Sequence, residues 1–345
     1  MNTISRFKNV KPKKVTQTTQ LVTSEVLFPD KGLPLLIQPV QTDVDLVAWT
    51  KEHLTWLEEQ VLNHGAILFR GFQVSTPLVF EQFASTICPD LYSENGEHPR
   101  EEISDHLYTP VFYPPEKKLL WHNENSFNAT WPVKIWFHCG KAADQGGETP
   151  IVDSRTVYEQ IAPAIRVPFE QKNVMYVRNY GNGLGLNWQA VFGTSDQQVV
   201  EEYCRRELIE FEWRSNDRLK TYQLRPAVLV HPQTGEKIWW NQATHWHTAC
   251  LDPDVRASLL ELFSEDDLPR NCYLGDGTPI EPSAMEHICS VYEHNELSFP
   301  WQQGDILMLD NMLVAHARNP FKGNRKLYVS MGGMMTLSTL KLEHS

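Results

Sequence analysis

The sequence predicts an α+β protein that is mainly β, with a helical flank before the core and a mixed insertion of helices and strands within it. From Leu119 onward the chain shows short β-like runs that are broken by glycine and proline. Helix patterns with N-terminal cap signals precede this region and interrupt it. With 345 residues, 41% of them hydrophobic, the chain can build a core without disulfides or a structural metal.

The chain begins with a basic arm. Residues 1–20 contain Arg6, Lys8 and further lysines but no acidic residue. We expect a disordered arm, with an organelle-targeting peptide as the alternative, and then a single domain over residues 21–345. In the flank of this domain we predict an edge strand at 33–39, one amphipathic helix at 43–64 that ends at Gly65, a buried strand at 66–71 and a helix that begins at Thr76-Pro77.

The core and its insertion follow this flank. We predict core strands at 133–139, 149–152 and 306–315, and helices at 195–208 and 252–263. The two helices belong to a mixed insertion that we place between about residues 160 and 300.

The overall charge argues for a small-molecule partner. The chain has 31 basic and 43 acidic residues, a net charge of −12, which disfavours nucleic acid and anionic membranes as partners. No apolar stretch approaches the roughly 18 to 20 residues of a membrane helix. The six cysteines form no CxxC pair, and we expect free thiols in a reducing cytoplasm.

A possible metal-binding pattern occurs at Trp121-His122-Asn123-Glu124. If this segment is a strand, His122 and Glu124 lie on the same face and can bind one metal ion together. His316 is the best candidate for a third ligand because it follows the apolar run 306–315. Two histidines and one carboxylate leave open positions on a metal, as in non-haem Fe(II) oxygenases. Taken singly, each residue has a plain structural explanation, a surface coincidence or a satisfied core histidine.

Two further features lie apart from the metal pattern. In the stretch 324–331, alternation places Arg325 on the same face as Leu327 and Val329, and a guanidinium on an apolar face needs an anion as partner. A dicarboxylate cosubstrate would provide that anion. The second feature is Gly146-Gly147-Glu148-Thr149, a tight turn that feeds a strand and carries a hydroxyl group at Thr149.

Together these residues resemble the TauD/TfdA family of Fe(II)- and 2-oxoglutarate-dependent dioxygenases. Members show an HxD or HxE pair, a Gly-Gly-x-Thr turn, and a distal histidine followed by an arginine. The resemblance runs from about residue 33 to residue 335. The stretches 178–185, 231–236 and 316–321 are similar to the branch that contains SyrP, an aspartate hydroxylase.

The resemblance implies a fold and a set of cofactor ligands. The fold is a distorted double-stranded β-helix, or jelly roll, with the insertion folded over the site as a lid. His122, Glu124 and His316 would bind Fe²⁺, Arg325 and Thr149 would bind the distal carboxylate of 2-oxoglutarate, and O2 would take the remaining position. Most relatives have aspartate where this chain has Glu124, which it shares with a subset that includes clavaminate synthase, and the spacing from His316 to Arg325 is short for the family.

The resemblance also implies a reaction type. Related halogenases have a small residue at the carboxylate position, so Glu124 argues against halogenation. We expect hydroxylation of an unactivated C–H bond of an amino acid in specialised metabolism, free or tethered to a peptide-synthetase carrier domain, with release of succinate and CO2. Desaturation and ring closure remain alternatives, as do a sulfonate or other small carboxylate as substrate and a non-catalytic binding member of the fold.

Substrate contacts are predicted from position and charge alone. Each candidate competes with a structural role, either an ion pair or a hydrogen-bonded scaffold. The candidates are Asn125, Ser126, Arg225, Gln242, His245 and Arg318.

Other motif-based functions are not supported by the sequence. The pair His122-x-Glu124 also begins the zinc-deaminase pattern, but no Pro-Cys-x-x-Cys follows. The glycines of 181–185 lack the GxGxxG spacing of a dinucleotide site, and the sequence has no GxSxG, HExxH or Walker motif.

Overall fold

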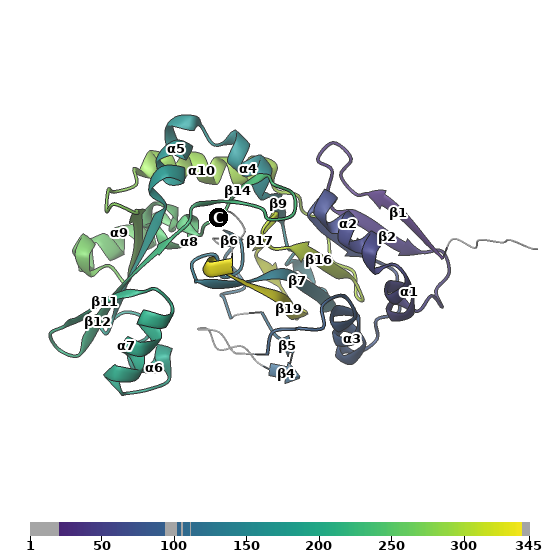
Figure 1. The fold of residues 1–345 in the computed structure, drawn as a ribbon, viewed down its shortest axis with the longest axis horizontal. Coiled ribbons are helices and arrows are strands. Elements are labelled where there is room, and N and C mark those ends of the chain that lie inside the picture. The colour runs from purple at the N-terminus through teal and green to yellow at the C-terminus, as the bar shows by residue number, and fades with distance from the viewer. Residues whose placement is uncertain (1–20, 94–101, 105, 111, 340–345) are drawn as a thin grey trace, which may run out of the picture.

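The core consists of a large sheet and a small sheet that face each other (Figure 1). The computed structural model describes residues 21–93, 102–104, 106–110 and 112–339, so the predicted basic arm lies outside the described residues. In spatial order the large sheet contains β1 (Val22–Val26), β2 (Leu35–Pro39), β3 (Ala66–Phe69), β16 (Ile306–Asp310), β7 (Thr130–Lys141), β19 (Lys326–Thr336), β5 (Leu107–Tyr108) and β4 (Glu102–Ser104). The small sheet contains β6 (Leu119–His122), β17 (Val314–Arg318) and β9 (Ile151–Asp153), and a short pair joins β8 (Gln145–Gly146) to β18 (Phe321–Lys322).

Side-chain alternation gives the large sheet two apolar faces. Along β16, Leu307 and Leu309 pack with residues of the small sheet, whereas Ile306 and Met308 pack with the flanking helices. The strand is fully buried because both of its faces are covered. This mainly β, jelly-roll-like core confirms the predicted fold class.

The helical flank covers the outer face of the large sheet and differs from the prediction in one respect. The single helix expected at 43–64 is two helices, α1 (Leu46–Glu52) and α2 (Leu54–His64). The break lies at His53, whose ring stacks on Trp49 at 4.5 Å and whose Nδ1 lies 2.7 Å from the Trp49 carbonyl oxygen. As predicted, α2 ends at Gly65 and α3 (Pro77–Ile87) has Thr76 as its N-cap.

Two strand predictions are also corrected. The segment at 33–39 is not at the sheet edge, because β2 pairs with β1 on one side and β3 on the other. The edge strand is β1, which the sequence analysis did not predict because three of its five residues are polar. The run at 306–315 is two strands, because the Asp310 carboxylate accepts hydrogen bonds from the backbone N–H groups of Met312 and Leu313 and turns the chain.

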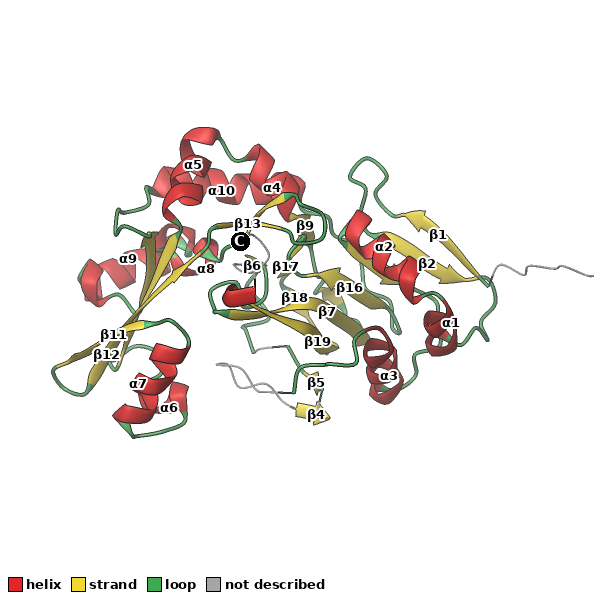
Figure 2. Ribbon diagram, viewed as in Figure 1, coloured by secondary structure: helices red, strands yellow, loops and turns green. Residues whose placement is uncertain are grey.

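The insertion forms a second layer beside the core (Figure 2). Its four-stranded sheet has the order β11-β12-β10-β15, and a two-stranded sheet pairs β13 with β14. The strands are β10 (Val174–Tyr180), β11 (Glu210–Arg214), β12 (Arg218–Arg225), β13 (Val228–Val230), β14 (Lys237–Trp239) and β15 (Arg270–Leu274). The α-helices are α4 (Ser154–Gln160), α5 (Pro163–Lys172), α6 (Trp188–Phe192), α7 (Gln197–Arg206), α8 (Ala243–Trp246), α9 (Pro253–Leu262) and α10 (Pro282–Asn295). Among the described residues, no helix is long and apolar enough to cross a bilayer.

Candidate active site

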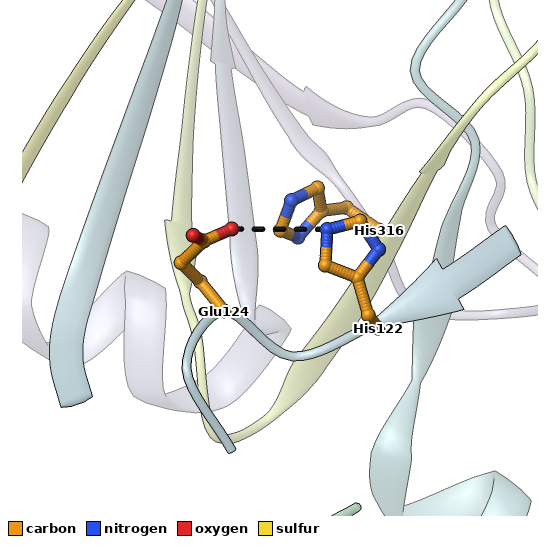
Figure 3. Close-up of side chains that lie close together, drawn as sticks. All are labelled: His122, Glu124 and His316. Carbon is orange, nitrogen blue, oxygen red and sulfur yellow. Dashed lines mark ion pairs between the residues drawn. The ribbon is translucent and has the colours of Figure 1, made fainter. Parts of the chain in front are cut away.

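Two histidines and a glutamate converge at the small sheet (Figure 3). His122 ends β6 and is paired in register with His316 on β17, and their ring centroids are 4.3 Å apart. His122 Nε2 lies 3.7 Å from Glu124 Oε2. One ligand atom from each residue lies within 4.8 Å of the others. The three predicted ligands, although distant in sequence, therefore point at one position.

This donor set fits a divalent transition metal. Ligand atoms that bind one ion at about 2.1 Å lie about 3 to 4 Å apart, so a small contraction would complete the site. His122 Nδ1 lies 2.9 Å from the Leu120 carbonyl oxygen, and a hydrogen bond from Nδ1–H leaves the Nε2 lone pair free to bind a metal. Nitrogen and carboxylate donors of this kind are typical of ferrous sites with open positions.

The route by which Glu124 reaches the site differs from the prediction. We expected His122 and Glu124 to alternate along one strand, but β6 ends at His122 and Glu124 lies in the following turn. The next residue, Asn125, has a φ of 58° in the left-handed region, where asparagine is better tolerated than most residues. The strand argument was therefore wrong, whereas the expected convergence of the side chains is correct.

A large cavity extends from the three side chains to Arg325. Its volume is about 680 Å³, and Leu327, Val329 and Met331 line it together with Arg325, as alternation predicted. The Arg325 Nε donates a hydrogen bond to the Gly147 carbonyl oxygen at 2.8 Å. Burial, and then the positive charge of Arg318, lowers the pKa of Arg325 to about 10. The site thus disfavours the bare cation, and an anion in the cavity would relieve this cost.

Thr149 lies on the wall of the same cavity. It is 4% exposed, and its Oγ1 accepts a hydrogen bond from Trp301 Nε1 at 3.2 Å. The turn before it requires glycine, because Gly146 and Gly147 have φ values of 67° and 77°. A Cβ on Gly146 would lie 2.2 Å from the Pro320 carbonyl oxygen. The Gly-Gly turn therefore brings the Thr149 segment close to the chain that follows His316.

Replacing Gly146 by alanine is expected to reduce the free energy of unfolding by about 2 kcal/mol or more, because a strained φ is combined with a backbone clash. Urea unfolding measures this loss. Gly183→Ala is the matched control, since Gly183 also has a positive φ, 90°, but no other atom lies within 4 Å of the place that its Cβ would take. Equal losses in the two variants would show that the contact with Pro320 is unimportant.

Comparison with known proteins gives the family. The model of the taurine catabolism dioxygenase TauD, TfdA family matches residues 30–331. The chain belongs to the TauD/TfdA family. Among curated proteins, it is 38% identical over 277 residues to the dapdiamide synthesis protein DdaC of Enterobacter agglomerans, covering 80% of this chain and 84% of that protein. It is 28% identical to a clavaminate synthase-like protein of Arabidopsis thaliana, covering 89% of this chain and 90% of that protein.

A solved structure shows the same fold. PvcB from Pseudomonas aeruginosa superposes with a TM-score of 0.54 at 14% identity, covering 92% of this chain and 94% of that one. This TauD/TfdA-family chain is a 2-oxoglutarate-dependent non-haem iron dioxygenase, and its cofactors are Fe²⁺, 2-oxoglutarate and O2, as the sequence predicted. Its substrate is a small molecule.

Among the predicted substrate contacts of this TauD/TfdA-family enzyme, Arg318 faces the cavity. Arg318 lines the cavity, and its two terminal nitrogens donate hydrogen bonds to the carbonyl oxygens of Tyr113, Pro114 and Lys117. Its buried Nε has no hydrogen-bond partner among the described residues. Burial lowers the pKa of Arg318. Arg318 therefore both orders one cavity wall and presents positive charge to the cavity.

Arg225, the other predicted arginine contact, lies away from the cavity. Arg225 is 1% exposed, is absent from the cavity lining, and donates hydrogen bonds to the carbonyl oxygens of Phe127, Glu207, Leu208 and Leu224. This geometry corrects the predicted substrate contact, because the guanidinium joins segments of backbone instead of facing the cavity.

Gln242 and His245 contact the backbone on either side of His122. Gln242 Nε2 donates a hydrogen bond to the Asn123 carbonyl oxygen at 2.8 Å, and His245 Nε2 lies 2.8 Å from the Leu120 carbonyl oxygen. Burial, and then the nearby His122, lowers the pKa of His245 to about 3, so its ring is neutral. Neither Gln242 nor His245 lines the cavity, so the geometry favours the scaffold role.

Asn125 and Ser126 lie in the turn beside Glu124. The buried Ser126 Oγ has no hydrogen-bond partner among the described residues.

The sequence analysis did not predict the residues that contact the proposed site residues and hold them in place. Asn311 binds the Glu124 backbone, Trp301 binds Thr149, and Tyr113 lies over Arg318, with the guanidinium carbon 5.4 Å from the ring centroid. The pair Asp310-Asn311 was a usable signal, because two polar turn-forming residues inside an apolar run indicate a turn.

Proposed function

We propose that His122, Glu124 and His316 bind the ferrous ion, that Arg325 and Thr149 bind the distal carboxylate of 2-oxoglutarate, and that the enzyme hydroxylates an unactivated C–H bond of an amino acid. The observation that carries this proposal is the convergence of three ligand atoms within 4.8 Å at a cavity that continues to the partly buried side chain of Arg325. When bound, iron, 2-oxoglutarate and O2 would together supply the oxidising chemistry that no side chain of the protein provides, with O2 as the oxidant.

The chain's own contribution is positioning and exclusion of water. Phe137, Leu327 and Val329 line the same cavity as the three proposed ligands and Arg325, so a cosubstrate in this space meets apolar walls. The Arg325 guanidinium fork suits a carboxylate, and such charge-assisted bonds are strong in a poorly solvated site. The carbonyl of Gly147 fixes the Nε side of this fork, which leaves the terminal nitrogens for the cosubstrate.

The cavity has room and charge for a substrate as well. With Arg325 assigned to 2-oxoglutarate, Arg318 remains as a second guanidinium in the same cavity, and its charge favours a substrate that carries a carboxylate. We therefore propose Arg318 as a contact to an amino-acid substrate. Asn125 and Ser126 stay predictions, because they lie in the turn beside Glu124 but do not belong to the cavity lining. Similarity to a dapdiamide synthesis protein supports a role in specialised metabolism.

Two lysines at the rim of the cavity bear on whether the substrate is free or tethered to a carrier domain. The exposed Lys322 and Lys326 belong to the lining of the cavity, where they place positive charge at its rim. Such a rim suits an acidic carrier domain, which would otherwise be repelled by a chain with a net charge of −12. We propose that a carrier domain docks at this rim if the substrate is tethered.

A panel assay tests the proposed function. The iron-loaded enzyme is incubated with 2-oxoglutarate and either free amino acids or carrier-loaded aminoacyl thioesters, and products are searched by mass spectrometry for a gain of one oxygen. Succinate release coupled to that gain is the expected result. A hydroxylated product from a sulfonate or other small carboxylate in the same panel would instead assign the alternative substrate class, and absence of succinate in every reaction would contradict an oxygenase.

A further inference from the structure

One side chain holds both backbone groups of the residue that supplies the carboxylate ligand. The Glu124 N–H donates to Asn311 Oδ1 at 2.7 Å, and Asn311 Nδ2 donates to the Glu124 carbonyl oxygen at 3.0 Å. Asn311 Nδ2 also donates to the Pro132 carbonyl oxygen at 2.8 Å. Asn311 is fully buried, with an exposed fraction of 0%, so its carboxamide depends on these protein partners for its hydrogen bonds.

The two hydrogen bonds from Asn311 to the Glu124 backbone take the place of the bonds that a neighbouring strand would make. Because β6 ends at His122, no sheet ladder fixes the backbone at Glu124, and Asn125 then adopts a left-handed φ of 58°. Two residues of an antiparallel pair exchange an N–H and a carbonyl bond, and the Asn311 carboxamide makes the same exchange with Glu124. The direction in which the Glu124 side chain leaves the backbone is therefore set by Asn311.

Asn311 also connects the carboxylate to both histidines. It lies in the turn between β16 and β17, and β17 carries His316. Its own carbonyl oxygen accepts a hydrogen bond from Asn123 Nδ2 at 2.6 Å, directly after His122. Its backbone N–H donates to the Val133 carbonyl oxygen at 2.8 Å. A single buried residue is thus bonded to, or lies on, the segments that carry all three proposed ligands.

We propose that Asn311 is a positioning residue that forms the carboxylate arm of the metal site before any metal binds. The inference rests on the proposed metal ligands and adds a cause for their arrangement. Outer partners of metal ligands commonly change metal affinity by about 10- to 100-fold, and we expect Asn311 to lie in this range. The Glu124 turn is already ordered when the protein folds. Metal binding therefore does not have to bear the entropy cost of ordering this turn, which keeps the metal affinity high.

The test compares two asparagine-to-aspartate variants with Co²⁺ as the probe. Asn311→Asp keeps the side-chain shape but removes the donors to Glu124 and Pro132. Asn179→Asp is the matched control, because Asn179 Nδ2 also donates to two backbone carbonyls, those of Asp266 at 3.0 Å and Leu268 at 2.7 Å, in the insertion sheet. The measurements are Co²⁺ affinity, the visible absorption spectrum of bound Co²⁺ and thermal stability.

We expect Asn311→Asp to weaken Co²⁺ binding by about 10- to 100-fold and to change the spectrum, whereas Asn179→Asp lowers thermal stability without changing either metal readout. Equal Co²⁺ affinity and spectra in wild type and Asn311→Asp would overturn the role of Asn311 while leaving the proposed function intact. Absence of Co²⁺ binding by the wild type would instead contradict the proposed metal site.

A measurement on the wild type covers the case in which Asn311→Asp does not fold. In the metal-free protein, the backbone N–H of Glu124 is expected to exchange slowly with solvent deuterium, because it is bonded to the buried Asn311 side chain. Rapid exchange of this N–H, with slow exchange in the neighbouring strands β7 and β16, would show that the turn is not held before metal binds and would overturn the proposal.

Discussion

Replacing His122 or His316 by alanine is expected to abolish the iron-dependent release of succinate from 2-oxoglutarate. Each substitution removes one of three donors that lie within 4.8 Å of one another, and the remaining two should bind the ion weaker by on the order of 100-fold or more. Succinate is measured with saturating 2-oxoglutarate and excess Fe²⁺, so that a lost ligand is separated from a merely lowered affinity.

The control for this prediction is His294→Ala, which removes an exposed histidine in the last turn of α10. It should retain wild-type turnover. If His122→Ala or His316→Ala turned over at the wild-type rate under these conditions, that residue would not be a ligand, and another donor would have to complete the site.

Replacing Arg325 by alanine is expected to raise the 2-oxoglutarate concentration needed for half-maximal turnover by about 100-fold, as loss of a poorly solvated charge partner commonly does. The physical reason is the environment of the guanidinium, where burial and Arg318 lower the pKa of Arg325 to about 10. Metal affinity should be unchanged, because Arg325 contacts the Gly147 carbonyl and not the metal ligands.

Two variants make the Arg325 prediction specific. Arg325→Lys keeps the positive charge but lacks the guanidinium fork, so its requirement for 2-oxoglutarate should lie between wild type and Arg325→Ala. Arg205→Ala removes an arginine whose side chain is 62% exposed on α7 and should have no effect. An unchanged requirement in Arg325→Ala would move the anchor to another cation of the cavity, of which Arg318 is the first candidate.

The sequence predicted which side chains converge better than it predicted the local structure that carries them. His316 and Arg325 are recognisable because one ends an apolar run and the other lies on an apolar face, and such residues need a chemical partner. Glu124 was paired correctly with His122 but for an incorrect reason, since it projects from a turn. Side-chain spacing alone does not distinguish a strand from a turn that brings the same two groups together.

The remaining errors arose where tertiary contacts override local patterns. Helical spacing continues across 43–64, but the contact of His53 with Trp49 ends one helix and allows a second to start. Arg225 was read as a candidate substrate contact, yet the carbonyls that satisfy it come from residues 127, 207, 208 and 224. No pattern in a single sequence shows which backbone carbonyls will surround a buried guanidinium.

The most direct test of the account is the amount of ferrous iron bound per chain under anaerobic conditions. Equilibrium dialysis of the wild type and Glu124→Ala, each with and without 2-oxoglutarate, measures this quantity. The wild type should bind one iron per chain, more tightly with 2-oxoglutarate, and Glu124→Ala should bind far less. Undiminished binding by Glu124→Ala, or no binding by the wild type, would contradict the assignment of this histidine–glutamate–histidine group as the iron site.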